Sequence, residues 1–358
     1  MARWPDQQAF ADADFDKERQ MWAIRVERPN NLAVVEVAEP VALPGQILLR
    51  TRRAGICGSD LHIYHGKNPF ARYPRVIGHE LLGIVAAIGD GVQGHAVGDR
   101  VALDPVISCG TCLACRRGRP NVCRNLQVIG VHCDGGMSEF CVIPAANAIK
   151  VPHNLSDRAA VMAEPYSIAA NIMLRCEADA TDIALIYGAG VIGLASLHAA
   201  NMKGIRCIVV DVDDARLERA RALGAARVVN SRNESVEATV KAETADYGVT
   251  LVVDAAGAPG ILEQAVQVTG PAGRIMVLNF QPGPSAIPQS ELVKKELSLL
   301  GSRLNRRLIP QVLGWFASGA IDPEKLVSHD FDFREVKEAF RLMEEHPEAT
   351  CKVQLTFD

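Results

Sequence analysis

Four cysteines lie close together in the first half of the chain, in the pattern Cys109-x2-Cys112-x2-Cys115-x7-Cys123. Four thiolates at this spacing can complete a tetrahedral shell around a zinc ion and leave no position for water, as in a structural site. Ten cysteines in 358 residues, four of them crowded here, fit metal thiolates better than a disulfide framework. We therefore expect a structural zinc ion in this loop and a reducing, cytoplasmic compartment.

A second group of ligand types is dispersed along the chain. Cys57 opens the run Cys-Gly-Ser-Asp-Leu-His, His79 and Glu80 are adjacent, and Glu164 precedes a proline. A catalytic zinc ion needs about three protein ligands and an open position, and Cys57, His79 and one of the two glutamates supply sulfur, nitrogen and oxygen. Asp60 is placed to orient the imidazole of His79. Each residue alone is better explained as structural, but together they predict a catalytic metal site.

A glycine-rich turn follows an apolar run over residues 183–187. It reads Gly188-Ala-Gly190-Val191-Ile192-Gly193 and opens a helix, which is the context in which such a motif binds a dinucleotide. The first glycine permits the tight turn, the second lets the backbone approach the pyrophosphate, and the third lets helix and strand pack closely. The alternative is an ordinary turn between a strand and a helix.

Asp211 ends the second apolar strand, eighteen residues beyond Gly193. A carboxylate at this place can accept hydrogen bonds from the ribose hydroxyls and would repel a 2′-phosphate, so the sequence predicts NAD rather than NADP. Arg216 and Arg219 follow closely and would still allow a phosphate to bind. A strand-end cap without a ligand is the alternative role for Asp211.

The elements around these motifs change in character along the chain. Residues 21–160 are rich in glycine, proline and short β-branched runs, as in an irregular, mostly β domain. Strand and helix patterns then alternate over residues 161–303, as in a doubly wound parallel sheet. The residue pattern changes again over residues 304–358, so the α/β domain is predicted to be inserted into the mostly β domain. Residues 1–20 are predicted to be a polar tail.

Composition excludes several classes of protein. No apolar run approaches the roughly 20 residues that cross a bilayer, and the start of the chain lacks the pattern of a secretory signal. The formal net charge is −4, with acids and bases dispersed, so neither nucleic acid nor membrane is an expected partner. One rival hypothesis remains, a zinc-ribbon protein that contacts nucleic acid through the arginines of the cysteine loop.

Together these motifs resemble the zinc-containing medium-chain dehydrogenase family, from about Met21 to the C-terminus. The resemblance implies a GroES-like β-barrel catalytic domain carrying two zinc ions and an inserted Rossmann domain that binds NAD. It also implies that Ser59 passes the substrate proton onward, that His62 continues the relay to solvent, and that Arg216 contacts the adenosine ribose. Whether Glu80 or Glu164 binds the catalytic zinc directly stays open.

Two further features bear on the substrate. A glutamate at position 164 is similar to the polyol (sorbitol) dehydrogenases, whereas liver-type alcohol dehydrogenases have a cysteine there. The run from Gly301 to Arg307 resembles the corresponding run of L-galactonate 5-dehydrogenase-like enzymes. Arg303 and Asn305 in this run are candidates to bind a substrate carboxylate. The alternative, equally common for arginines in such a turn, is a solvent-exposed turn that binds no ligand. We expect an enzyme that oxidises a secondary alcohol of a polyol or sugar acid, as a homo-oligomer, either dimer or tetramer. The alternatives are a sorbitol-like or L-threonine-type dehydrogenase and an inactive nucleotide-binding relative.

Overall fold

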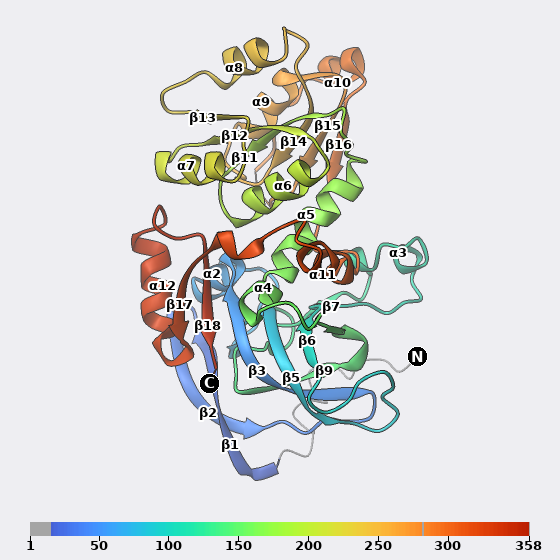
Figure 1. Cartoon of the computed structure of the whole chain (residues 1–358), viewed down its shortest axis with the longest axis vertical. Coiled ribbons are helices and arrows are strands. Elements are labelled where there is room, and N and C mark those ends of the chain that lie inside the picture. Colours follow the sequence, from blue (N-terminus) through green and yellow to red (C-terminus); the bar gives the residue numbers. More distant parts are fainter. Residues whose placement is uncertain (1–15, 281–282, 358) are drawn as a thin grey trace. The chain divides into compact units, whose positions relative to one another are not determined.

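The computed structural model describes residues 16–280 and 283–357 (Figure 1). The chain divides into two compact units. Unit 1 comprises the residues up to Glu164 and those from Asn305 onward, and unit 2 comprises Pro165–Leu304. Unit 2 is therefore one continuous segment, whereas unit 1 is made of two separate ones.

Unit 1 is built mainly of strands. In its described residues the largest sheet has the order β10-β6-β5-β3-β18-β17, with β9 also paired to β3, a second sheet has the order β2-β1-β4, and β7 pairs with β8. The strands are β1 (Asp16–Arg28), β2 (Asn31–Glu39), β3 (Gln46–Ile56), β4 (Arg75–Val76), β5 (Glu80–Ile88), β6 (Arg100–Leu103), β7 (Val106–Ile107), β8 (Gln127–Val128), β9 (Phe140–Pro144), β10 (Ala148–Lys150), β17 (Val327–Asp332) and β18 (Lys352–Thr356).

The central strand β3 explains why this sheet forms. Its run Ile47-Leu48-Leu49 is buried, as expected of a strand covered on both faces, and Ala54 and Ile56 continue the core toward its end. Short helices connect the strands: α2 (Gly58–Tyr64), α3 (Leu113–Arg116), α4 (Asp157–Val161), α11 (Ile309–Ala317), α12 (Val336–Glu345) and the 3-10 helices η1 (Pro120–Val122), η2 (Ala145–Asn147), η3 (Pro323–Leu326) and η4 (Phe333–Glu335).

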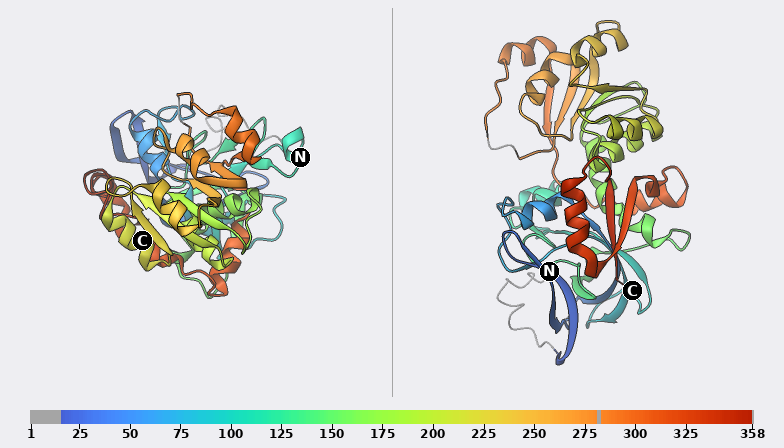
Figure 2. Two further views of the ribbon diagram at one scale, coloured as in Figure 1. Left: turned by 90° about the horizontal axis from the view of Figure 1, so that it is seen from above. Right: turned by 90° about the vertical axis from the view of Figure 1, so that its left-hand side faces the viewer.

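Unit 2 is a parallel sheet with helices on both sides (Figure 2). In the described residues its strand order is β13-β12-β11-β14-β15-β16. The strands are β11 (Ile183–Tyr187), β12 (Arg206–Asp211), β13 (Arg227–Asn230), β14 (Val249–Asp254), β15 (Thr269–Val277) and β16 (Ser298–Gly301), and the helices are α5 (Ala163–Arg175, which begins in unit 1), α6 (Val191–Met202), α7 (Asp214–Ala222), α8 (Val236–Glu243), α9 (Ile261–Val268) and α10 (Gln289–Lys295).

The strand order reverses between β11 and β14, and all of the pairings are parallel. This is the doubly wound arrangement that the alternating patterns predict, and that prediction is confirmed. Such sheets bind ligands at the carboxyl ends of the strands beside the reversal point. The glycine-rich turn after β11 lies at this place.

The first strand corrects one prediction. β1 begins at Asp16 and pairs with β2 through Gln20 and Ala38 and through Met21 and Val37. Residues 16–20, predicted as part of a polar tail of residues 1–20, thus belong to a hairpin, because backbone pairing needs no apolar side chains. Residues 1–15 lie outside the described residues.

No helix in the described part of the chain combines the length and the apolar character needed to cross a bilayer.

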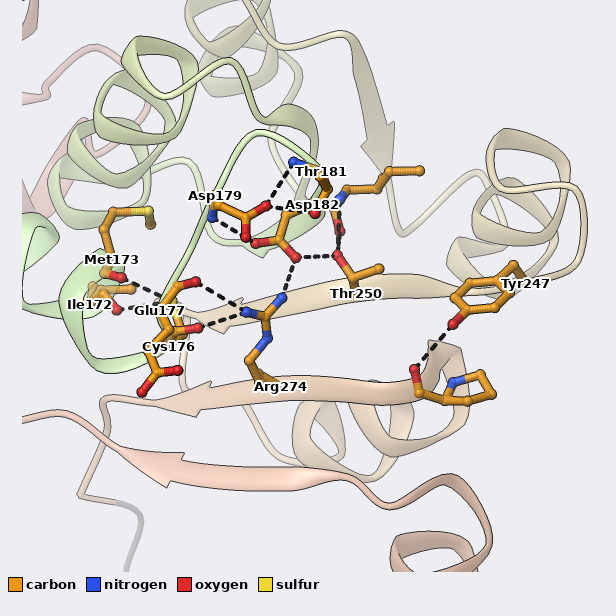
Figure 3. A network of polar contacts seen from close by, with 12 residues as sticks. Ile172, Met173, Cys176, Glu177, Asp179, Thr181, Asp182, Tyr247, Thr250 and Arg274 are labelled. Carbon is orange, nitrogen blue, oxygen red and sulfur yellow. Dashed lines mark hydrogen bonds and ion pairs between the residues drawn. The ribbon is translucent and has the colours of Figure 1, made fainter.

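A buried polar network ties the end of α5 to three strands of unit 2 (Figure 3). Arg274 on β15 forms an ion pair with Asp182, whose side chain is 2% exposed, and donates to the carbonyl oxygen of Cys176 at 2.8 Å. Thr250 at the start of β14 donates to the same carboxylate at 2.6 Å. Asp182 therefore depends on Arg274 for most of its charge compensation.

We expect the Arg274→Ala variant to lose about 3 kcal/mol of unfolding free energy, because a buried carboxylate would lose its cation. Urea denaturation monitored by circular dichroism measures the loss. The matched control is Arg227→Ala, which breaks an exposed ion pair with Glu234 in the same unit and should cost about 1 kcal/mol or less. Equal losses in the two variants would contradict the role of burial.

Candidate active site

The end of β3 and the start of β5 bring three predicted ligands together. Gly55 on β3 pairs with Glu80 on β5, Cys57 follows β3 directly, and His79 directly precedes β5. As a result the Cys57 sulfur, an imidazole nitrogen of His79 and a carboxylate oxygen of Glu80 all lie within 4.8 Å of one another. The group that meets this limit does not include Glu164.

Asp60 lies beside His79, as the sequence predicts. Its Oδ2 accepts the backbone N–H of Cys57 at 2.9 Å, and its Oδ1 lies 3.7 Å from Nδ1 of His79. Burial lowers the pKa of His79, but the charges of Asp60, Cys57 and Glu164 outweigh this and hold the pKa well above its usual range. Nδ1 therefore faces the carboxylate, which leaves Nε2 for another partner.

The charges around His79 fit a cation. Asp60, Glu80 and Glu164 are all buried, and burial raises the pKa of Glu164 to about 7. His79 Nδ1 and Asp60 Oδ1 are buried without a hydrogen bond. A zinc ion suits this site, because it would compensate the clustered negative charge and because sulfur, imidazole and carboxylate are its usual ligands.

Lys352 on β18 was not among the predicted site residues, although its ammonium group lies next to this cluster. Its Nζ is 2.7 and 2.6 Å from the two carboxylate oxygens of Glu80, and both side chains are almost fully buried, at 2% and 1% exposed. A signal was present, since Lys352 and Gln354 alternate with apolar Val353 and Leu355 and so share one face of the strand. Which carboxylate that face meets could not be read from the pattern.

Two residues expected to relay a proton lie on α2. The hydroxyl of Ser59 is 3.5 Å from Nε2 of His79, and the side chain is half-buried. His62, one helical turn later, is exposed. The two side chains share one face of the helix, so together they lead from His79 toward solvent.

The four clustered cysteines converge as predicted. The sulfur of Cys112 lies 3.5 Å from that of Cys115 and 3.9 Å from that of Cys123, and the sulfurs of Cys123 and Cys109 are 3.4 Å apart. These spacings are near those across a tetrahedral shell with metal–sulfur bonds of about 2.3 Å. Backbone N–H groups of Cys109, Cys112 and Asn125 point at the sulfurs, at 3.3 Å each, which favours thiolates. None of the cysteines forms a disulfide.

The glycine-rich turn has the geometry that its spacing predicts. Gly188 has a positive φ of 94°, and a Cβ added at Gly193 would meet the carbonyl oxygen of Gly188 at 1.8 Å. A Cβ at Gly190, the N-cap of α6, would meet nothing within 4 Å. The first and third glycines are thus required by the turn itself, while Gly190, Val191 and Ile192 leave backbone open to a phosphate.

Asp211 caps the end of its strand, the alternative role given above, and it also supports this turn directly, which the sequence did not predict. One carboxylate oxygen accepts the backbone N–H of Ala189 at 2.7 Å, and the other accepts those of Val212 at 2.7 Å and Asp213 at 3.1 Å. A carboxylate offers about four acceptor positions, so capacity for a ribose hydroxyl remains. Arg216 lies half-buried on α7, where its backbone N–H donates to the capping Asp213.

The two residues predicted to bind a substrate carboxylate have different surroundings. Arg303 is half-buried, with its guanidinium carbon 5.5 Å from the centre of the Phe280 ring. Asn305 is fully buried, and its amide donates to Asp104 while its oxygen accepts the backbone N–H of Arg307. Asn305 therefore fixes the local chain, and the prediction that it contacts substrate is not supported.

Two family models match this chain. The alcohol dehydrogenase GroES-like domain matches residues 43–153, and the zinc-binding dehydrogenase model matches residues 191–318. Among curated relatives, the starvation-sensing protein RspB of Escherichia coli is 46% identical over 343 residues, covering 94% of this chain and 99% of that protein. An L-threonine 3-dehydrogenase of Pyrococcus horikoshii is 35% identical over 338 residues, covering 90% and 95%.

Solved structures give the same assignment. The alcohol dehydrogenase rspB from E. coli CFT073, complexed with the cofactor NADH, has a TM-score of 0.91 and 44% identity, covering 94% of this chain and 99% of that one. The L-idonate 5-dehydrogenase of E. coli has a TM-score of 0.86 and 26% identity, covering 95% and 99%. With the two family models and the convergent ligand sets, these likenesses show that the chain is an oxidoreductase of the zinc-containing medium-chain dehydrogenase family.

Proposed function

We propose that this protein oxidises a secondary hydroxyl group of a small polyhydroxylated compound with NAD, at a zinc ion held by Cys57, His79 and a glutamate. The observation that carries the proposal is the convergence of Cys57 and His79 among three buried carboxylates, beside which the described residues place a single buried lysine, Lys352. A nucleotide-binding scaffold without catalysis would not require this cluster, because burying charged groups is unfavourable in free energy. A second zinc ion, at the four clustered cysteines, has a structural role in this proposal.

Three residues of the site, Asp60, Ser59 and His62, have different roles in proton transfer. When bound, zinc is a Lewis acid that lowers the pKa of a coordinated hydroxyl, and the dinucleotide supplies the hydride acceptor. Asp60 fixes the orientation of His79. The hydroxyl of Ser59 receives the substrate proton, and the exposed imidazole of His62 passes it to solvent.

The preference for NAD rests on Asp211. We expect Asp211→Ala to lower the ratio of NADH affinity to NADPH affinity by about tenfold or more, because the charge that repels a 2′-phosphate is lost. NADH binding should also weaken, since the turn loses its bond to Ala189. Fluorescence titration with both nucleotides measures the two effects. Asp213→Ala, which removes a neighbouring carboxylate, is the control, and an unchanged ratio in Asp211→Ala would refute the assignment.

The proposed substrates are polyols and sugar acids, with L-galactonate-like acids ahead of sorbitol-like polyols. A glutamate at position 164 makes a hydrophilic pocket, and Arg303 offers a guanidinium that suits a carboxylate. The similarity to an L-idonate 5-dehydrogenase is in line with this class. A second candidate is L-threonine, which also carries a secondary hydroxyl and a carboxylate, and it is favoured by the similarity to an L-threonine 3-dehydrogenase.

A comparison of three substrates separates these candidates. We expect the kcat/KM for an aldonate, measured by NADH absorbance, to exceed that for its parent alditol, and the difference to shrink about tenfold in Arg303→Ala, as for loss of a charge-assisted contact. L-Threonine is the third member of the panel. A higher kcat/KM for the alditol would favour a sorbitol-like enzyme, a higher value for L-threonine the second candidate, and no turnover on any substrate an inactive relative.

A further inference from the structure

A cavity of about 350 Å³ lies within unit 2, where β14 and β15 end. Its walls come from the turn after β14, the first turn of α9 and the residues that follow β15. A cavity of this size accommodates a small molecule. The described residues that line it include neither the glycine-rich turn nor Asp211, so it is distinct from the predicted nucleotide site. Residues used below are Asp254, Pro259, Leu262, Glu263 and Val277.

The carboxylate of Asp254 presents an unused oxygen in this cavity. The residue is only 4% exposed. Its two described hydrogen bonds, from the backbone N–H groups of Ala256 at 3.2 Å and Gly257 at 2.8 Å, both go to Oδ1. A carboxylate has acceptor positions on both oxygens, so Oδ2 keeps its capacity. A buried carboxylate in this state gains free energy when a donor or a cation reaches it.

Glu263 brings a second negative charge to the same cavity. One of its carboxylate oxygens accepts the backbone N–H of Ala286 at 2.8 Å, while the other is buried without a hydrogen bond. Glu263 belongs to the first turn of α9, and the start of a helix stabilises a negative charge. The residues described as lining the cavity include no lysine, arginine or histidine. Its two carboxylates are therefore not compensated by a cationic side chain of the wall.

The other walls favour an organic cation over a metal ion. Pro259, Leu262 and Val277 give the cavity an apolar side. Divalent calcium or magnesium takes about six oxygen ligands, and in the described part of the chain neither carboxylate belongs to a group of three metal-ligating side chains. An alkylammonium compound satisfies both sides, because its nitrogen donates charge-assisted hydrogen bonds and its carbon chain contacts apolar surface.

We propose that this cavity binds a small primary alkylammonium compound, with its ammonium group at Asp254 and Glu263 and its carbon chain against Leu262 and Val277. The nucleotide-binding unit would then hold a second ligand besides the dinucleotide. Such a site does not depend on the zinc chemistry proposed above, because all of its residues belong to unit 2.

Saturation-transfer NMR with n-butylammonium as the probe tests this on the zinc-loaded protein. We expect a saturable signal from the butyl protons, with a Kd on the order of 1 mM for so small a compound. Glu263→Gln and Asp254→Asn should each weaken binding about tenfold, since each removes a charge-assisted contact. The control is Glu237→Gln, which neutralises an exposed carboxylate paired with Lys241 in the same unit and should keep the affinity within about twofold.

Two further samples establish where the probe binds. The signal should persist with saturating NADH, because the cavity does not include the glycine-rich turn, and in Cys57→Ala, because the cavity does not include the proposed zinc ligands. Loss of the signal with NADH would place the probe at the nucleotide site, and loss in Cys57→Ala would place it on the metal. Either result would overturn the proposal, as would no saturable signal or an unchanged affinity in folded Glu263→Gln. If Asp254→Asn does not fold, Glu263→Gln decides alone.

Discussion

Replacing Cys57 or His79 by alanine should lower kcat/KM on the preferred substrate by on the order of 10⁴-fold, since a Lewis acid contributes several kcal/mol to the stabilisation of a developing alkoxide. NADH binding should be retained, because the glycine-rich turn and Asp211 belong to unit 2 while both ligands belong to unit 1. Steady-state kinetics and fluorescence titration measure the two quantities on the same samples.

The control for this experiment is Cys207→Ala, which removes a buried thiol from β12. It should keep the zinc content and most of the activity, so that loss of a thiol is distinguished from loss of a ligand. Activity retained in either Cys57→Ala or His79→Ala would show that the metal, if bound there, takes no part in the reaction.

Replacing Cys112 by serine should remove about one zinc ion per chain and lower Tm by about 10 °C, because structural zinc binding contributes directly to the stability of the segment that it orders. The loop from Cys109 to Cys123 contains little regular structure of its own, only the short helices α3 and η1. The conformation of this loop is therefore held mainly by the four sulfurs that converge within it.

Metal analysis by mass spectrometry and differential scanning calorimetry measure these effects. Cys207→Ala again serves as the comparison, since its thiol lies in unit 2 and outside both groups of ligands. If the wild type holds one zinc ion and the four cysteines are recovered as disulfides, the structural assignment fails.

The sequence predicted most of the nucleotide-binding unit, because its motifs are local. The spacing of Gly188, Gly190 and Gly193 determines the turn within a few residues, and Asp211 is located by the end of an apolar run. The cysteine loop was equally accessible, since all of its ligands fall within fifteen residues. In such cases the chain between the functional residues is too short to separate them.

Two features of unit 1 could not be predicted in the same way. The partner of Glu80 is 272 residues away along the chain, and no pattern within β18 indicates that its strand lies next to β3. The contact of Asn305 could not be predicted for a related reason, because its amide is directed at Asp104, 201 residues earlier. Contacts between distant strands depend on sheet order, which hydrophobic periodicity does not encode.

The pairing of β3 with β18 has a consequence for the biosynthesis of the protein. Val353 pairs with Ile56, so the central sheet of unit 1 joins its two segments, which lie before and after unit 2 in the sequence. Domains usually fold in the order of their synthesis, but here the segment made in the middle is the one that can fold first, as a continuous unit on the ribosome. The Glu80 and Lys352 pair can form only after β18 has emerged. The nucleotide-binding unit is thus expected to mature before the catalytic metal site.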